Sequence, residues 1–154
     1  MKNEIKKIEE KELRKAISRI LCSSGITPNM KGFAYLKEAI IMVYLDSDDL
    51  NTMTKVVYPN IAKLYITSPR AVERCIRIAI EKAWKKGRSN EFYEKVGFKW
   101  LNQRPTNSEY IFIIVEILNN LWYNISYKNH LLYLILHLSS AASIKGDIIP
   151  NLYF

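Results

Sequence analysis

Residues 68–87 read SPRAVERCIRIAIEKAWKKG and carry the strongest helical signal in the chain. A serine followed by a proline is typical of a helix start, with Ser68 as the N-cap and Pro69 at the first helical position. Gly87, which follows two lysines, is typical of a helix end. The stretch therefore predicts one helix that runs from Pro69 to about Lys86.

This helix has two chemically different faces. At about 100° per residue, its apolar side chains fall within about 100° of arc and form the expected core face. The core face holds Val72, Ile76, Ala79, Ile80 and Ala83. The opposite face holds Arg70, Arg74, Arg77 and Glu81, with Glu73 at its edge. The pattern predicts a helix that packs through one side and presents an arginine stripe on the other.

The segments on either side also read as helices. Pro59 opens a short helix over 59–65, and the turn at 66–68 joins it to the longer helix, so that about 59–86 form a candidate helix-turn-helix. Thr106 to Glu109 match a capping box at the start of another helix. Further helices are expected at 4–21, 33–45, 50–57, 89–96, 106–122 and 128–143. No strand series is evident, so the expected fold class is all-α, a compact multi-helix domain with an extra C-terminal helix.

The basic charge is concentrated in one part of the chain. The net charge is +8, and residues 51–90 alone hold nine basic and two acidic side chains. Such a block is typical of a surface that binds a polyanion, and the alternative is a strongly solvated helix face. Because the second helix of a helix-turn-helix enters the major groove, the block favours double-stranded DNA as the partner.

The outward residues have side chains that suit base and phosphate recognition. The planar guanidinium of arginine can donate two hydrogen bonds to guanine, and Glu73 can accept one from cytosine N4. At the helix start, Thr67, Ser68 and Arg70 are candidates for contacts with the DNA backbone. The cations further along would act only as counter-charges to phosphates. These are Lys82, Lys85, Lys86 and Arg88.

Other classes of protein find no support in the sequence. Cys22 and Cys75 are too few for a four-cysteine zinc site, and His130 and His137 lack the four-residue spacing of a helical metal site. No catalytic constellation or phosphate loop is present, so we expect no enzyme activity, no cofactor and no metal. Without a signal peptide or membrane-spanning stretch, we expect a cytoplasmic protein with buried, reduced cysteines and no membrane partner.

Four segments resemble one known family in order and in spacing. They are YLKEAI (35–40), TKVVYPNIAK (54–63), VERCIRIAIEKAW (72–84) and PTNSEY (105–110). Through them, about residues 16–118 resemble the C-terminal DNA-binding effector domain of the sporulation-initiation response regulator of endospore-forming Firmicutes. The expected organisation is an effector domain over 1–118 and an unassigned apolar C-terminal extension over 119–154.

The resemblance implies a six-helix domain that binds a short TGTCGAA-like box. It implies that Glu73, Arg74 and Arg77 contact bases, and that Thr67 and Ser68 supply hydroxyls at the start of the recognition helix. It also implies two protein partners, the sigma factor of RNA polymerase and a second copy, which would bind as a homodimer or in tandem on DNA.

Two departures from the family shape the functional hypotheses. Only about 20 residues precede the effector segment, too few for the family's receiver domain, so phosphorylation of this chain is not expected to control it. The first hypothesis is therefore a sequence-specific transcription regulator without a receiver. Because residues 88–104 diverge from the family, the alternative is an interaction protein that antagonises or pairs with the full-length regulator. A third is a degenerate DNA-binding remnant with a non-native tail.

The extension over 119–154 is apolar and aromatic. It could be a helix that packs on the effector core, a surface for self-association or a partner, or an attachment to a membrane surface. The last is least favoured, because residues 128–143 contain a single lysine and lack the basic face of membrane-surface helices.

Overall fold

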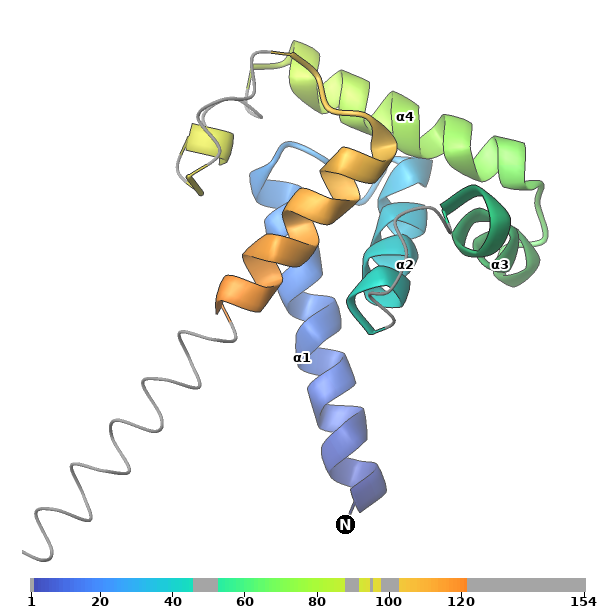
Figure 1. Ribbon diagram of the computed structural model, residues 1–154, viewed down its shortest axis with the longest axis vertical. Helices are drawn as coiled ribbons and strands as arrows, with labels where there is room; N and C mark the ends of the chain where they lie inside the picture. The colour runs from blue at the N-terminus through green and yellow to red at the C-terminus, as the bar shows by residue number, and fades with distance from the viewer. Residues whose placement is uncertain (1, 46–52, 88–91, 95, 98–102, 122–154) are drawn as a thin grey trace, which may run out of the picture. The chain divides into compact units, whose positions relative to one another are not determined.

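The computed structural model describes residues 2–45, 53–87, 92–94, 96–97 and 103–121, which are helical apart from short connections (Figure 1). The elements are α1 (Lys2–Ser23), α2 (Lys31–Leu45), the π-helical segment η2 (Met53–Val57), α3 (Tyr58–Leu64) and α4 (Pro69–Lys85). A helical turn at 92–94 and a helix over 107–121 follow. No strand occurs in these ranges, and the predicted all-α class is confirmed.

Where the structure describes the chain, the predicted helices agree with it except at two places. The prediction for 50–57 differs in kind, because Met53–Val57 is π-helical and leads directly into α3. Pro59 has no amide hydrogen to donate, so a regular α-helical ladder cannot run through it. Within the predicted helix 89–96, residues 92–94 are helical and 96–97 form a turn. The predicted helix over 128–143 lies outside the described residues.

One hydrophobic core joins the helices of the unit Met1–Leu118. All four labelled α-helices and the helix over 107–121 contribute side chains that are almost fully buried. The largest aliphatic ones are Ile17, Leu21, Ile26, Leu36, Ile40, Ile61, Ile76, Ile80, Ile111, Ile114 and Leu118. Since α4 supplies its whole apolar face to this core, its outward face is fixed by the packing of the rest.

A buried hydroxyl pair joins the end of α1 to the helix over 107–121. Ser24 Oγ and the Tyr110 hydroxyl lie 2.6 Å apart, and Ser24 Oγ also donates to the Leu21 carbonyl. Both residues are buried, and burial raises the pKa of Tyr110, so the phenol stays protonated at neutral pH. The pair gives the apolar core a directional contact between the first and last described helices.

α4 comes into close backbone contact with the N-terminal end of α2, which it crosses (Figure 1). A Cβ placed on Gly32 would lie 2.3 Å from the Cys75 carbonyl oxygen and 2.7 Å from the Ala79 Cβ. Both distances are shorter than van der Waals contact, so only glycine fits at residue 32. α4 packs more extensively against α2 than against any other labelled element, and Gly32 is what lets the two backbones meet.

The turn between α3 and α4 is a Schellman motif, in which the amides after the helix return to carbonyls of its last turn. The Thr67 amide donates to the Ala62 carbonyl at 2.9 Å, and the Ile66 amide donates to the Lys63 carbonyl at 3.4 Å. The motif needs a left-handed residue, usually glycine. Here that residue is Ile66, with φ of 51° and 96% of its surface exposed.

The same motif ends α1 with the usual residue. The Ile26 amide donates to the Leu21 carbonyl and the Gly25 amide donates to the Cys22 carbonyl, with Gly25 at φ of 94°. A β-branched side chain pays a steric cost in this conformation that glycine does not. Ile66 is therefore strained, and its exposed side chain makes too few contacts to offset the steric cost.

The expectation that both cysteines are buried is wrong. Cys22 is exposed and Cys75 is half-buried. Each directly adjoins a fully buried residue on its helix, Leu21 or Ile76, and so lies off the inward-facing stripe. The burial of a cysteine depends on its position around the helix axis, and both cysteines lie at the edge of the inward-facing stripe. Their small size and hydrophobicity therefore did not predict their burial.

Replacing Gly32 with alanine will destabilise the fold. Gly32→Ala should lower the free energy of unfolding by about 1–3 kcal/mol, because the added methyl group must push α2 and α4 apart. Lys31→Ala, at the exposed neighbouring residue, is the control and should change it by less than about 0.5 kcal/mol. Denaturant unfolding measures both, and equal effects of the two variants would contradict the close approach.

Replacing Ile66 with glycine will stabilise the fold. Ile66→Gly should raise the free energy of unfolding by about 1 kcal/mol, because it relieves the left-handed strain and removes almost no buried surface. Thr67→Gly is the control at a residue without positive φ, and it should give no gain. A thermal melt in which Ile66→Gly is less stable than the parent chain would show that the side chain has a packing role.

Candidate nucleic-acid interface

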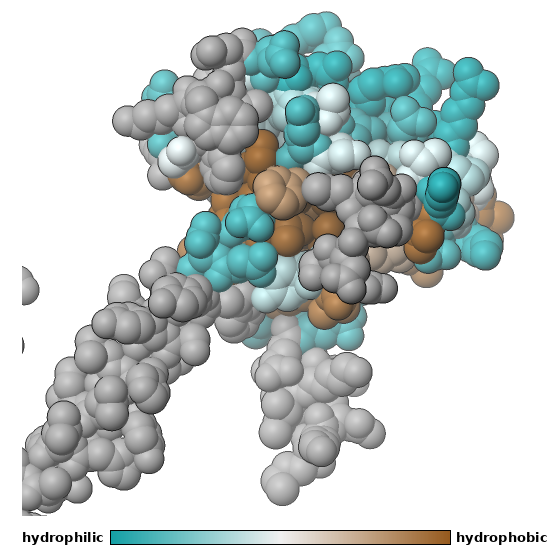
Figure 2. All heavy atoms as spheres, viewed as in Figure 1, coloured by the Kyte–Doolittle hydropathy of each residue, from teal (hydrophilic) through white to brown (hydrophobic). Residues whose placement is uncertain are grey.

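α4 presents the predicted arginine stripe to solvent. Its core face is buried at all the expected positions, namely Val72, Ile76, Ala79, Ile80 and Ala83. On the other side, Arg70, Glu73, Arg74 and Arg77 line one shallow surface pocket. Figure 2 shows hydrophilic side chains along α4, on the side away from the apolar core. The helical periodicity thus predicted both faces, and the structure brings these four side chains together.

Within the pocket, one arginine is paired. Arg77 Nη1 lies 3.6 Å from Glu73 Oε1, and the two side chains are 50% and 43% exposed. Such exposed pairs contribute only about 0–1 kcal/mol, so a phosphate or a base edge can compete for either partner. Arg70 and Arg74 have no carboxylate partner within the described part of the chain. Two guanidinium groups are therefore free to bind an anionic or acceptor-rich ligand.

The start of α4 is held by Ser68. The Ser68 hydroxyl oxygen accepts a hydrogen bond of 3.2 Å from the Ala71 amide, which confirms the predicted N-cap. Ser68 Oγ keeps its own hydrogen to donate outward. The Thr67 amide already donates to the Ala62 carbonyl in the turn. A phosphate could therefore bind at Thr67 only through the exposed hydroxyl.

The second half of α4 and its C-cap add three exposed lysines, Lys82, Lys85 and Lys86. Lys85 Nζ lies 2.7 Å from Glu81 Oε1. That hydrogen bond, with further contributions from the charges of Lys85, Arg104 and Arg77, lowers the pKa of Glu81. Arg88 lies outside the described residues. The lysines lie beyond the pocket, so they extend its positive charge without lining it.

Arg104 is a cation that the sequence analysis did not assign to this surface. It is exposed, and its charge contributes to the lowered pKa of Glu81 in α4. No periodic pattern marks a residue in the connection that precedes Pro105. Only the folded chain brings it near α4.

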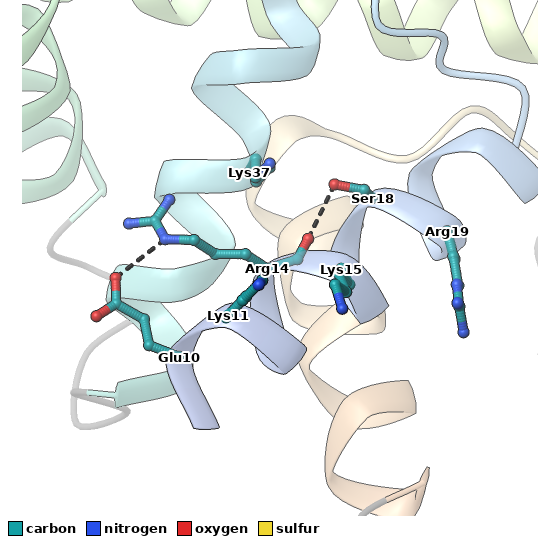
Figure 3. A pocket seen from close by; sticks show the side chains of 7 residues that line it. All are labelled: Glu10, Lys11, Arg14, Lys15, Ser18, Arg19 and Lys37. Atoms are coloured by element: carbon teal, nitrogen blue, oxygen red, sulfur yellow. Dashed lines mark hydrogen bonds and ion pairs between the residues drawn. The ribbon is translucent and has the colours of Figure 1, made fainter. Parts of the chain in front are cut away.

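A second basic groove lies along α1 and is a weaker candidate (Figure 3). Its cations are Lys11, Arg14, Lys15, Arg19 and Lys37. Arg14 is bonded to Glu10 at 3.0 Å and to Glu38 at 2.8 Å, and Lys15 is bonded to Glu12 at 2.8 Å. These three carboxylates thus pair two of the five cations in the groove. The pocket on α4 has one paired arginine out of three, and it is the stronger candidate because it lies on the second helix of a helix-turn-helix.

Two searches of the described residues gave negative results. No group of three or more histidine, cysteine, aspartate or glutamate side chains there is arranged to hold a metal ion. Nor is any helix in those ranges both long enough and apolar enough to cross a membrane.

The sequence matches a known protein family over most of its length. The family described as sporulation initiation factor Spo0A C terminal matches residues 17–118. This range contains the helix-turn-helix, the arginine pocket and the capped helix as far as residue 118, and it agrees with the resemblance found from the four sequence segments.

Loss of the N-cap will weaken α4 measurably. Ser68→Ala should lower the free energy of unfolding by about 1 kcal/mol, because the Ala71 amide loses its acceptor. Ser68→Asp should preserve stability, since aspartate caps as well as serine does. The control is Thr67→Ala, whose hydroxyl makes no cap. Denaturant titration compares the three variants, and equal losses at residues 67 and 68 would contradict the capping role.

Proposed function

Since the chain belongs to the Spo0A C-terminal family of DNA-binding transcriptional effector domains, we propose that it is a sequence-specific DNA-binding regulator of transcription of the sporulation-initiation type. The observation that carries the proposal is the exposed arginine face on the second helix of a helix-turn-helix. α3, the Schellman turn and α4 make up that motif. In such motifs the first turns of the second helix meet base edges.

In this proposal α4 lies in the major groove with its N-terminal half against the bases. Arg74 and Arg77 donate to guanine O6 and N7, and Glu73 accepts from cytosine N4. The 3.6 Å Glu73–Arg77 pair supports these roles, because it holds a donor and an acceptor side by side on one helix face. A TGTCGAA-like box offers both guanine and cytosine to them.

The surrounding polar and basic side chains would bind the DNA backbone. Thr67, Ser68 and Arg70 lie at the start of α4, where hydroxyl and guanidinium groups can reach phosphates. Lys82, Lys85, Lys86 and Arg88 supply charge without base readout, so they give affinity that falls as salt rises. The position of α4 as the second helix of the helix-turn-helix favours it over the α1 groove as the surface that meets the duplex.

The proposed partners beyond DNA are a second copy on an adjacent box and the sigma factor of RNA polymerase. A reporter driven by a box-containing promoter separates an effector from the alternative antagonist. Increased output supports contact with polymerase, whereas decreased output from a promoter that the full-length regulator activates supports the antagonist.

Substitution of Arg74 will reduce base preference. The protein should bind a duplex with tandem TGTCGAA-like boxes more tightly than a scrambled duplex, and Arg74→Ala should lose about 1–3 kcal/mol of that preference. Fluorescence anisotropy at two salt concentrations measures both duplexes.

The matched control is Lys82→Ala, which removes an exposed cation from the same helix. It should weaken binding to both duplexes equally and reduce the salt slope by about 1. If wild-type protein binds the two duplexes equally and responds only to salt, the base-reading assignment is wrong.

A further inference from the structure

Asn107 joins three helical elements through one side-chain nitrogen. Its Nδ2 donates to the backbone carbonyl of Glu73 in α4 at 3.1 Å and to the Tyr58 hydroxyl in α3 at 3.3 Å. Asn107 itself begins the helix over 107–121. Both amide hydrogens are thus used, and both acceptors belong to the helix-turn-helix.

The bonded carbonyl belongs to Glu73, one of the residues that line the arginine pocket. Glu73 adjoins Arg74 in sequence and lies one helical turn before Arg77, and all three line the pocket. A contact to the backbone at Glu73 therefore acts on the segment that carries the proposed base-reading side chains, and it leaves those side chains free.

We propose that Asn107 is a positioning residue that sets the rotation and the axial position of α4, and that base preference depends on it. This inference rests on the proposed function. Apolar packing of the core face is non-directional and tolerates small rotations and slides of a helix. A hydrogen bond requires a defined distance and angle, so it selects one of these placements.

Neighbouring hydrogen bonds and packing fix the position of Asn107. The Thr106 amide donates to Glu109 Oε2 at 2.8 Å and the Glu109 amide donates to Thr106 Oγ1 at 3.3 Å, which confirms the capping box and holds the backbone on both sides of Asn107. Tyr58 is only 5% exposed, so its hydroxyl is fixed by the core. The capping box fixes the backbone of Asn107 and the Tyr58 hydroxyl fixes its side-chain amide, so the Asn107 side chain is in position before DNA binds.

Asn107→Asp is the decisive variant. Aspartate has nearly the same shape and is favourable in the first turn of a helix, so the helix over 107–121 should still form. Its carboxylate cannot donate to the Glu73 carbonyl. The ratio of affinities for the box and the scrambled duplex should fall about 5-fold or more, as expected when a bidentate base contact is lost, while the salt slope changes little for both duplexes.

Ser108→Asp is the matched control for charge. It places a carboxylate one residue away, in the same turn, and leaves both Asn107 donors in place. It should weaken binding to both duplexes equally and preserve the affinity ratio. Asn107→Ala removes the donors without adding charge and should lower the ratio as Asn107→Asp does.

Hydrogen–deuterium exchange without DNA gives a second readout. Asn107→Asp should speed exchange of amides over 73–77 relative to those over 79–85, because the directional contact lies at Glu73. Ser108→Asp should leave the pattern of exchange unchanged.

Three outcomes would overturn the proposal in different ways. If wild-type protein shows no box preference, the proposed function fails and the role of Asn107 fails with it. If wild-type preference is present and survives in both Asn107 variants, only the positioning role fails. A fall in melting temperature with an unchanged affinity ratio would make Asn107 a merely structural residue, which also overturns the proposal.

Discussion

The close approach of α2 and α4 at Gly32 is the constraint on which the rest of the structure depends. With a side chain at that position, the Cys75 carbonyl and the Ala79 methyl group would have to move away. Because residue 32 is glycine, α4 packs against α2 through its apolar face and this face is buried in the core. The arginines on the opposite face of α4 therefore point to solvent. A glycine on one helix thus determines what a different helix presents to solvent.

Position in the fold distinguishes the two basic surfaces more sharply than charge does. The groove on α1 has more cations than the pocket on α4, and its carboxylates pair only Arg14 and Lys15. On α4 the carboxylates are fewer and the pairs are exposed, so they orient the side chains at little energetic cost to a competing ligand. A strongly basic composition therefore indicates a class of partner, whereas the place of the arginines on the second helix of a helix-turn-helix favours one surface.

Much of this architecture could be predicted from the sequence because it is local. The buried face of α4 follows from residue spacing, and the Ser68 cap and the Thr106–Glu109 box follow from residue types a few positions apart. The features that escaped prediction involve unusual residues or distant partners. Ile66 occupies a position where glycine would have given the signal, and Asn107 meets Glu73 across 34 residues of chain. The burial of Cys22 was wrongly predicted because residue type was weighed above helical phase.

The hydroxyl pair at Ser24 and Tyr110 has a consequence for the order in which the protein is made. The partners are separated by 86 residues, which a ribosome adds in about 4–17 seconds at about 5–20 residues per second. α2, α3 and α4 are synthesised during that interval, and until it ends neither this pair nor the amide contact at Asn107 can form. The helix that is translated last among those described contacts both the end of α1 and α4. A nascent chain therefore carries all its proposed base-reading side chains before it can hold them in place.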